Sequence, residues 1–458
     1  MPELPEVETV LRTLERQIEG RSIKDIRVLY PRIIEGDEED FRQRLTGRSF
    51  RSFLRRGKYL LFEMDDVTLV CHLRMEGKFY LMDPEEPVDK HTHVIFSLSD
   101  GRDLRYHDVR KFGRMEVIEK RDDYQDFKGL GPEPFDKRFN RKYCKEYLKG
   151  QKRPVKEILL DQGFCAGIGN IYADEILYAS KIHPLTKGNR LNEEEISAMI
   201  TNTRRILKEA VKAGGTTIRS YTSSLGVTGR FQMSLRCHDR DTCPDCGQKI
   251  EKIRVGGRGT YYCPKCQERD INIAITGTIG SGKSTAVDIL RKKGYDVFVC
   301  DEYNAYLLEK GNAGYLAVKE AFPKCFDGEE LDKKKLAGVV FRNRKEKAKL
   351  EGILHPLIIE EMKREMKEKH TFFAEVPLLY ECGLEGLFDS VVLVTSKKSI
   401  ALQRLQNRGI DEKEGKRRLR NQMSSEIKKK LADEIIYNNG SLSELEKSVT
   451  ELIGKIIC

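Results

Sequence analysis

The 458-residue chain contains no run of apolar residues near the roughly 20 that a membrane-spanning helix requires. Its acidic, proline-interrupted start also lacks the basic and apolar regions of a secretory signal peptide. No linker rich in glycine, serine or proline separates its halves, and no internal repeat is present. These absences argue against a membrane or secreted protein, and we expect a cytoplasmic one with no membrane partner.

Disulfide scaffolds are a second class that the sequence disfavours. Of the twelve cysteines, four fall into two tight C-x2-C pairs and the rest are scattered. A cytosolic chain with one metal site fits this distribution better than a secreted disulfide framework. The chain is rich in charged residues, which make up 34% of the sequence. Its formal net charge is +10 and its pI is near 8.8. This balance favours anionic partners such as nucleic acids or nucleotides.

Four segments differ in sequence style, and the length allows roughly two to four domains. Residues 1–134 alternate short apolar runs with Gly and Asp turns, which predicts a β-sandwich or barrel. Residues 135–238 carry helical patterns around the glycine-rich turn GFCAGIGN, and residues 239–267 contain the paired cysteines. Residues 271–458 alternate strand, loop and helix patterns, which predicts an α/β domain with a parallel sheet.

The first residues, MPELPEVET, place a proline directly before a carboxylate. Removal of Met1, expected before a small residue, leaves Pro2 with a free secondary amine, and an α-amino group titrates near about pH 8. Such an amine can attack a sugar C1′ and form a covalent iminium intermediate. Glu3 is close enough in sequence to carry protons. The chain start is therefore a candidate nucleophile with an acid beside it.

Four cysteines have the spacing of a structural zinc site: Cys243, Cys246, Cys263 and Cys266. Two C-x2-C knuckles at this distance can supply four thiolates to one tetrahedral Zn²⁺. A closed site of this kind holds a small hairpin rigid and does no chemistry itself. Because the hairpin carries Arg258 among other cations, we predict a finger that faces phosphates.

Five further strings belong with these features: RRGKYLLFE, HLRMEGKF, DVRKFGR, GIGNIYADEILYASKIHP and RGTYYCPKCQ. Together with PELPEVET they resemble the formamidopyrimidine-DNA glycosylases across residues 1–267. The resemblance implies an N-terminal β-sandwich, a helix–two-turn–helix domain and a zinc finger. It also implies an enzyme that removes oxidised purines, 8-oxoguanine and formamidopyrimidines, from duplex DNA and cleaves the abasic site by β,δ-elimination.

The same resemblance assigns roles to individual residues. Pro2 is the implied nucleophile, and Glu3 is a proton donor or relay. Lys58 is implied to assist β-elimination, Arg258 to contact the phosphate near the δ-elimination step, and Asn170 to grip a DNA phosphate.

Chemistry at C1′ of a stacked nucleotide also requires that the nucleotide be flipped out and the vacancy filled. Met75 and Phe112 are the apolar wedges expected to fill it, and Arg110 can hydrogen-bond the orphaned base. Weaker candidates for phosphate contacts are His72, His91, Lys152 and Arg153. The Thr- and Ser-rich stretch at 216–229 suits a loop that embraces a damaged base. One departure from the family is Thr92, where an acid is common.

A second chemistry begins at GTIGSGKS, which matches the phosphate-binding loop G-x4-G-K-S between a predicted strand and a predicted helix. Backbone N–H groups of such a loop cradle the ATP phosphates, Lys283 reaches the β- and γ-oxygens, and Ser284 binds Mg²⁺. The predicted ATP-binding residues of the loop are Gly277, Gly280, Ser281, Gly282, Lys283, Ser284 and Thr285.

The strings ITGTIGSGKST, LHPLI, EVPLLYECGL, RLQNRG and ADEIIYNNGS resemble the dephospho-CoA kinases over residues 271–458. The resemblance implies ATP-dependent phosphorylation of the ribose 3′-hydroxyl of dephospho-CoA. We expect Asp301 at a strand end on the carboxyl edge of the sheet, where it can orient or deprotonate that hydroxyl. Arg404 and Arg408, expected on one helical face, can clamp the transferring phosphate as part of a lid. The family's second acid is Tyr303 here, which leaves the detail of the acceptor site open.

We therefore predict a monomeric enzyme with two activities, one structural Zn²⁺ per chain, and Mg²⁺ bound with ATP. One alternative makes the first half a catalytically silent DNA-docking module that carries a kinase, but the intact Pro2, Glu3, Lys58 and Arg258 argue against it. Another is a glycosylase of the endonuclease VIII type, specific for oxidised pyrimidines, which the PELPEVET start disfavours. For the second half, the alternative is another P-loop monophosphate kinase.

Overall fold

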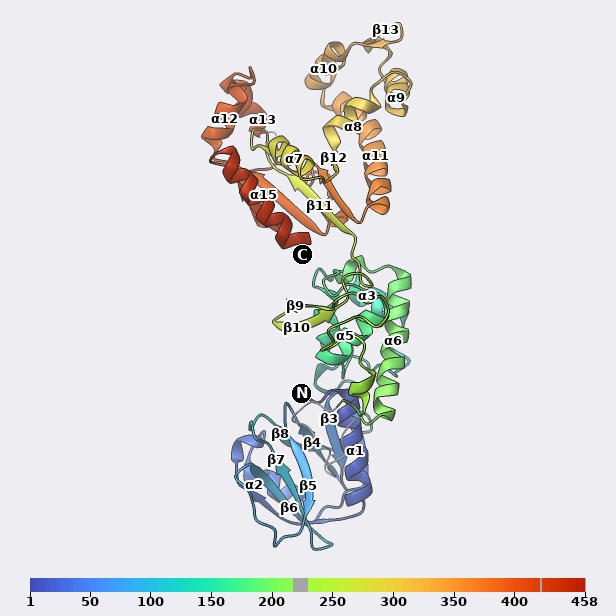
Figure 1. Cartoon of the computed structure of the whole chain (residues 1–458), viewed down its shortest axis with the longest axis vertical. Coiled ribbons are helices and arrows are strands. Elements are labelled where there is room, and N and C mark those ends of the chain that lie inside the picture. Colours follow the sequence, from blue (N-terminus) through green and yellow to red (C-terminus); the bar gives the residue numbers. More distant parts are fainter. Residues whose placement is uncertain (217–229, 421, 458) are drawn as a thin grey trace. The chain divides into compact units, whose positions relative to one another are not determined.

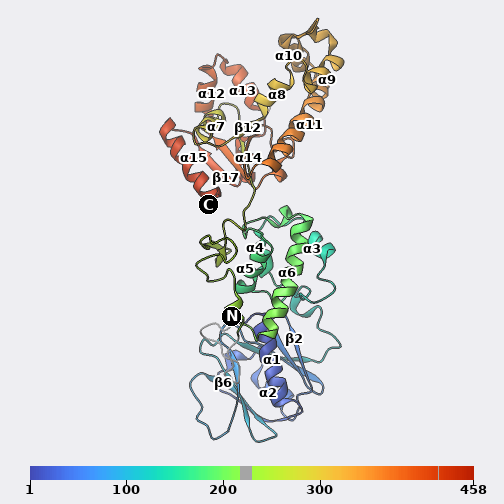
Figure 2. The same cartoon turned by 45° about the vertical axis from the view of Figure 1, so that its right-hand side comes forward.

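The computed structural model describes residues 1–216, 230–420 and 422–457. It contains two compact units, residues 1–269 and residues 270–458 (Figures 1 and 2). Their boundary falls inside the junction at 268–270, and the finer division of the first unit at 134 and 238 stays a prediction. Within the described ranges, no helix is both long and apolar enough to cross a membrane.

A sandwich of two antiparallel four-stranded sheets forms the first part of the first unit, as predicted. One sheet has the strand order β1-β6-β7-β5, and the other has the order β2-β3-β4-β8. Side chains from both inner faces, among them Phe62 and Phe96, share one core. The strands are β1 (Ile23–Val28), β2 (Ser52–Arg56), β3 (Tyr59–Glu63), β4 (Val67–His72), β5 (Lys78–Met82), β6 (Thr92–Leu98), β7 (Asp103–His107) and β8 (Arg114–Glu119).

Helix α1 (Leu4–Ile18) interrupts the β character predicted for this segment. Glu3 caps the helix, and its own N–H donates to the Glu6 carboxylate at 2.9 Å in a capping box. Pro5 lies in the first turn, where no intrahelical donor is needed. The apolar face of α1 packs into the sandwich core together with α2 (Glu38–Leu45).

A helical part with its own apolar core follows, as the sequence predicts. It contains α3 (Arg141–Leu148), α4 (Val155–Leu160), α5 (Asn170–Ala179) and α6 (Glu193–Lys212). The hairpin of β9 (Glu251–Val255) and β10 (Arg258–Tyr262) completes the unit. Short 3-10 helices along the chain are η1 (Pro31–Ile33), η2 (Phe127–Gly129), η3 (Gly188–Arg190), η4 (Phe231–Ser234), η5 (Pro323–Cys325) and η6 (Glu385–Leu387).

The second unit is built on a five-stranded parallel sheet of order β12-β15-β11-β16-β17. Its strands are β11 (Ile271–Thr276), β12 (Val297–Val299), β15 (Thr371–Glu375), β16 (Ser390–Thr395) and β17 (Glu434–Tyr437), beside the small hairpin β13 (Phe326–Asp327)–β14 (Glu330–Leu331). One face packs on α7 (Lys283–Lys292) and α15 (Leu442–Ile457). The other face packs on α8 (Cys300–Leu307), α9 (Ala313–Ala321), α10 (Lys333–Arg342) and α11 (Arg344–Glu368). Helices on both faces of a parallel sheet confirm the predicted α/β class.

Two local expectations in this unit are wrong. Strand β12 ends at Val299 and α8 starts at Cys300, so Asp301 follows the carboxyl end of the strand, as expected, but lies in the first turn of a helix and not on the strand. Helix α12 (Lys398–Gln406) ends before Arg408, which therefore does not share a helical face with Arg404. The cause is Gly409, whose φ of 79° closes the helix. The remaining helices are α13 (Glu412–Arg420) and α14 (Ser425–Leu431).

Candidate active sites and zinc centre

Glu3 lies at the N-terminus of α5, far along the sequence from its own position. Its carboxylate, 3% exposed, accepts the N–H groups of Ile171 at 3.0 Å and Tyr172 at 3.4 Å. Free N–H groups and the helix dipole at this end stabilise a negative charge. A Cβ on Gly169 would lie 2.3 Å from the carboxyl carbon of Glu3, so the second glycine of GIGN permits this approach. The strings PELPEVET and GIGN therefore meet in one site.

A second buried carboxylate, Glu6, is absent from the predicted set. It accepts hydrogen bonds from the Tyr172 hydroxyl at 2.7 Å and from the Thr216 N–H at 2.7 Å. Burial raises the pKa of Glu6, and the nearby Glu3 carboxylate raises it further. The available sequence signal was the E-x-x-E spacing of a capping box. Glu6 fixes the chain start to α5 and to Thr216.

The amino terminus and Lys58 face these two carboxylates. Lys58 follows Gly57 in the tight turn between β2 and β3, and only 6% of it is exposed. Burial lowers the pKa of Lys58, Arg258 lowers it further, and the carboxylates oppose the shift. Burial also lowers the pKa of the α-amino group of Met1. Both amines are thus shifted toward the neutral form that can attack carbon or accept a proton.

The hairpin that carries Arg258 is tied to α5 by Asn170. The Asn170 side-chain amide donates to the carbonyl of Gly259 at 2.9 Å, next to Arg258 at the start of β10. A carboxamide has a second N–H, which this bond does not use. Arg258 itself is exposed. The structure therefore brings together Glu3, Lys58, Asn170 and Arg258, which lie on four separate strings of the sequence.

A buried ion cluster under α5 supports this arrangement, and the sequence reasoning missed it. Lys156 and Asp174 have fully buried side chains that form an ion pair. The Lys156 ammonium also donates to the Asn170 carbonyl at 2.8 Å. The other oxygen of Asp174 binds the His238 ring at 2.6 Å and accepts the Tyr261 N–H of β10 at 3.3 Å. One carboxylate thus joins α4, α5 and the hairpin, and no local motif distinguishes it from a surface acid.

The two predicted wedges stand on separate turns. Phe112 is 48% exposed in the loop between β7 and β8, and the guanidinium of Arg110 stacks 4.8 Å from its ring centre. Asp108, fully buried, shapes this loop by accepting the N–H groups of Arg110 at 3.0 Å and Phe112 at 2.9 Å. Met75 is half-buried in the turn after β4. Exposure of a large ring on a braced loop suits a wedge better than a core role.

The candidate phosphate contacts differ in their surroundings. Burial lowers the pKa of His72 to about 3, and its Nδ1 accepts the Arg74 N–H at 3.0 Å. The ring is therefore neutral with its proton on Nε2, where it can be donated to a phosphate. His91 is half-buried against the ring of His107, with ring centres 5.5 Å apart. Arg153 is exposed and bonds Asp161 at 3.1 Å.

Thr92 stands where the family commonly has an acid, and a nearby carboxylate is supplied by Asp89. Its hydroxyl donates to Asp89 at 2.9 Å, and the same carboxylate accepts the His91 N–H at 2.9 Å. Asp89, three residues before Thr92, therefore holds the backbone of His91. Of the predicted base-embracing loop at 216–229, residues 217–229 lie outside the described part of the chain.

The four cysteines converge as the spacing predicts. Their sulfur atoms all lie within 4.8 Å of one another, with Cys243–Cys266 at 3.7 Å and Cys246–Cys263 at 3.5 Å. Zn–S bonds of about 2.3 Å in a tetrahedron separate the sulfurs by about 3.8 Å, so the set fits a closed zinc site. The Tyr178 hydroxyl of α5 lies 3.1 Å from Cys243 Sγ and further ties the finger to the helix.

The phosphate-binding loop of the second unit has the backbone that its glycines allow. Gly280 and Gly282 have φ values of 78° and 97°. A Cβ on Gly280 would lie 2.7 Å from the Ala401 carbonyl oxygen, and one on Gly282 would lie 2.0 Å from Asn438 Nδ2. Ser284, in the first turn of α7, is exposed. A cradle that side chains would fill, at a helix N-terminus with an exposed hydroxyl, fits ATP phosphates and Mg²⁺.

Lys283 lies 3.8 Å from the carboxylate of Glu375, a residue that the sequence reasoning missed. Glu375 ends β15 at the carboxyl edge of the sheet, where α/β folds bind ligands. Burial lowers the pKa of Lys283 and raises that of Glu375. A phosphate anion bound beside Lys283 and a divalent cation bound beside Glu375 would compensate these two buried charges.

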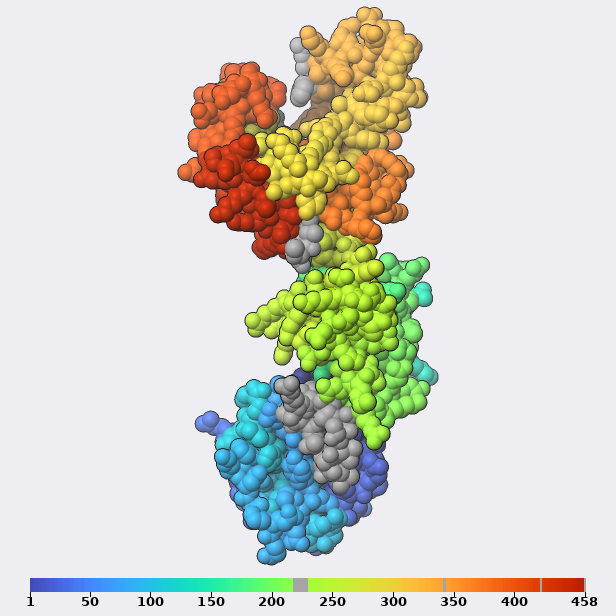
Figure 3. Space-filling view, in the orientation of Figure 1, coloured from blue at the N-terminus to red at the C-terminus, as the bar shows by residue number. Residues whose placement is uncertain are grey.

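The two arginines occupy different positions. Arg404 donates to the Ser281 carbonyl of the phosphate-binding loop at 3.3 Å and to Asn438 Oδ1 at 3.2 Å. Arg404 thus braces the loop, while Arg408 is exposed beyond α12 and near enough to lower the pKa of Lys283. The space-filling view shows the second unit hollowed between α12–α13 and α8–α10 (Figure 3).

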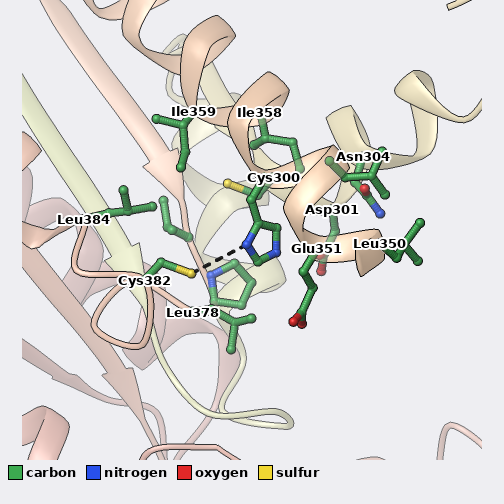
Figure 4. A pocket seen from close by; sticks show the side chains of 14 residues that line it. Cys300, Asp301, Asn304, Leu350, Glu351, Ile358, Ile359, Leu378, Cys382 and Leu384 are labelled. Carbon is green, nitrogen blue, oxygen red and sulfur yellow. Dashed lines mark hydrogen bonds between the residues drawn. The ribbon is translucent and has the colours of Figure 1, made fainter. Parts of the chain in front are cut away.

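Asp301 borders a cavity of about 220 Å³ beside β15. Figure 4 shows Asp301, Asn304 and Glu351 on one side of it and Leu378, Cys382 and Leu384 on the other. The Cys382 thiol lies 4.0 Å from His355 Nδ1. Tyr303 is absent from the lining and packs on Phe298, with ring centres 5.4 Å apart. Tyr303, where the family has its second acid, therefore does not line this cavity.

Models of four known families match consecutive parts of the chain. They are the formamidopyrimidine-DNA glycosylase N-terminal domain over residues 1–115, the formamidopyrimidine-DNA glycosylase H2TH domain over 130–222, the zinc finger found in FPG and IleRS over 241–269, and dephospho-CoA kinase over 271–444. The matches follow the order of the two units.

Individual relatives match the first unit. A formamidopyrimidine-DNA glycosylase from Ligilactobacillus salivarius is 50% identical over 272 residues, which are 58% of this chain and 99% of that protein. One from Bacillus cereus is 47% identical over 275 residues, 59% of this chain and 100% of that protein. Among solved structures, a complex of a Lactococcus lactis FPG mutant with Fapy-dG-containing DNA is 42% identical with a TM-score of 0.56. A complex of Lactococcus lactis Fpg with abasic-site DNA is 41% identical with a TM-score of 0.55, and both cover 58% of this chain and 100% of the other.

Proposed function

Because the chain belongs to the formamidopyrimidine-DNA glycosylase family and carries a dephospho-CoA kinase domain as well, we propose that it excises oxidised purines from duplex DNA and phosphorylates dephospho-CoA at two separate sites. The first unit is a DNA glycosylase and abasic-site lyase with a structural zinc finger. The second is an ATP- and Mg²⁺-dependent kinase that acts on the ribose 3′-hydroxyl. A cytoplasmic monomer is the proposed working form, and sedimentation of the purified chain tests its mass.

Pro2, once Met1 is removed, is the nucleophile of the first reaction. Its nitrogen attacks C1′, the bond from C1′ to the damaged base breaks, and the opened sugar remains as an iminium on Pro2. Loss of a C2′ proton then expels the 3′-phosphate, δ-elimination expels the 5′-phosphate, and water releases the sugar fragment. Burial at the chain start lowers the pKa of the Met1 α-amino group, and the same surroundings would favour a neutral Pro2 amine once Met1 is removed. The lowered pKa of Lys58 suits proton removal.

The remaining residues of the first site bind and position the DNA. Glu3 carries protons at the sugar, held by the N–H groups of α5. Arg258 and Asn170 contact the flanking phosphates from the hairpin and the helix terminus, while Met75, Arg110 and Phe112 fill the vacancy left by the flipped nucleotide. His72, His91 and Arg153 are proposed as outer phosphate contacts. The zinc finger, when zinc is bound, fixes the hairpin.

One observation carries this proposal: the chain start, with the Met1 amine next to Pro2, comes together with the Glu3 carboxylate and Lys58 at the N-terminus of α5. Borohydride trapping on duplex DNA with 8-oxoguanine opposite cytosine tests it. The wild-type chain should be trapped and Pro2→Gly should not. Glu209→Gln, a change at an exposed position of α6, serves as a control that should be trapped normally. Full trapping of Pro2→Gly, or of a chain with an N-terminal extension, contradicts the assignment, and no trapping of the wild type favours the silent docking module.

In the second site, Lys283 holds the β- and γ-phosphates of ATP and Ser284 binds the Mg²⁺ that neutralises them. Glu375 and Asp301 stand at the opposite side, and Asp301 orients the 3′-hydroxyl of an acceptor seated in the adjoining cavity. Arg404 braces the loop and Arg408 approaches the transferred phosphoryl group. Asp301→Asn should lower kcat with dephospho-CoA by about 100-fold, the size of a general-base effect. Faster phosphorylation of a nucleoside monophosphate than of dephospho-CoA would favour the other P-loop kinases.

A further inference from the structure

The segment at residues 422–428, here called the strap, touches both substrate regions of the kinase unit. At its start, Gln422 Oε1 accepts the Ile279 N–H of the phosphate-binding loop at 2.9 Å. Its middle residue Ser425 places its hydroxyl 3.5 Å from the Thr278 hydroxyl of the same loop. At its end, Lys428 points to the loop that follows β15. The strap therefore spans the donor and the acceptor side of the unit.

The contact at Lys428 is a buried one. The side chain of Lys428 is fully buried, and its ammonium donates to the Pro377 carbonyl at 3.1 Å and to Glu381 Oε2 at 3.3 Å. Glu381 also accepts the Met423 N–H at 3.0 Å, so the two ends of the strap bind the same loop. A buried ammonium without these partners would be strongly unfavourable, because its charge has no water around it.

The loop held by Lys428 is also the floor of the acceptor cavity. Pro377, Leu378, Cys382 and Leu384 line this cavity opposite Asp301. This stretch forms turns and a 3-10 helix with no strand ladder to fix it. Its start is held by the Val376 N–H, which donates to the Ile275 carbonyl of β11 at 2.9 Å. The Lys428–Glu381 pair and the bond to the Pro377 carbonyl are further constraints on the position of the cavity wall.

We propose that the strap is a positioning element of the kinase, in which Lys428 sets the acceptor-side loop through Pro377 and Glu381 and Gln422 sets the phosphate-binding loop through Ile279. This rests on the proposed place of dephospho-CoA in the cavity beside Asp301. Neither residue touches the reacting atoms. The charge of Lys428 also lowers the pKa of Lys283, but its hydrogen bonds go to the acceptor-side loop, whereas that of Gln422 goes to the phosphate-binding loop. Their loss should therefore separate the two Michaelis constants.

Steady-state kinetics of the full chain with ATP and dephospho-CoA test this. Lys428→Met should raise the KM for dephospho-CoA by about tenfold, the loss of a charge-assisted hydrogen bond, with the KM for ATP changed less than about twofold. Lys428→Arg should restore most of the affinity. Gln422→Ala should show the opposite split, with the KM for ATP rising more. Lys430→Met, an exposed lysine of the same helix, is the matched control and should change neither value.

A double-variant cycle identifies the route. Because Lys428 acts through Glu381, Glu381→Gln combined with Lys428→Met should cost little more than Lys428→Met alone. Additive losses, equal changes in both Michaelis constants, or the same loss in Lys430→Met would each overturn the proposal. If Lys428→Met does not fold, Gln422→Ala and Glu381→Gln still decide, since they must raise different Michaelis constants. Wild-type turnover and Asp301→Asn test the cavity assignment separately, so its failure is distinguishable from failure of the strap.

Discussion

Replacing Asp174 by Asn should leave the buried ammonium of Lys156 without its counter-ion while the shape of the side chain is kept. Lys156 and Asp174 are both fully buried, and the carboxylate also binds His238 and the hairpin N–H of Tyr261. Removing one partner of a buried pair costs about 3 to 5 kcal/mol. For a unit of this size, we expect the melting temperature of the first unit to fall by roughly 6 to 20 °C.

Calorimetry of the full chain measures the effect, with the kinase transition identified by its shift on adding ATP. Only the first-unit transition should move. Glu209→Gln is the control, because the Arg205–Glu209 pair on α6 is about half exposed and should contribute less than about 0.5 kcal/mol. Adding Lys156→Met to Asp174→Asn should recover stability, since the uncompensated charge is then gone. A loss below about 1 kcal/mol, or a double variant less stable than the single one, would refute the reasoning.

The pH dependence of the Asp174→Asn variant has a definite sign. Burial lowers the pKa of Lys156 in the folded protein, and Asp174 opposes that shift. Without Asp174 the folded pKa falls further below its unfolded value of about 10.4. Between these two values the unfolded state binds more protons than the folded state, so stability rises with pH. The deficit of the variant should therefore shrink as the pH is raised through this window and be largest below it.

Three further outcomes are expected. Metal analysis should find one zinc ion per chain, and a chain purified without zinc would contradict this. Removing the zinc with a chelator should weaken DNA binding while kinase turnover persists, because the four thiolates shape only the finger. Arg258→Ala should weaken binding to all sequences and flatten the dependence of log K on log salt by about one unit, whereas a lesion-specific defect with an unchanged slope would oppose the phosphate role. Lys283→Ala should abolish phosphorylation of dephospho-CoA and leave glycosylase activity intact, with Pro2→Gly giving the reverse. If lesion DNA and ATP change each other's affinity by more than about fivefold, the two sites are coupled and this independence is wrong.

Much of the chemistry was readable from short strings. The C-x2-C pairs predict a four-thiolate cluster because the knuckle geometry is local, and the sulfurs do converge. The G-x4-G-K-S loop is local in the same sense, since its glycines alone allow the backbone that Gly280 and Gly282 adopt. Helix patterns also located α4 to α7. The end of a helix was harder to predict from the sequence. Helix α12 ends at Gln406, so Arg408 does not lie on the helical face where its spacing from Arg404 had placed it.

Tertiary structure alone decided which buried charges meet. Lys156 and Lys428 lie outside the quoted strings, and Asp174 and Glu375 lie inside them without a local sign of their role; each acquires that role from burial and from a partner far away in sequence. Glu3 illustrates the difference. Its position next to Pro2 identifies it as a candidate from the sequence, but the N–H groups that bind its carboxylate belong to residues 171 and 172, at the N-terminus of α5. A sequence specifies residue types and local periodicity, whereas desolvation and charge pairing depend on distances that only the packed chain sets.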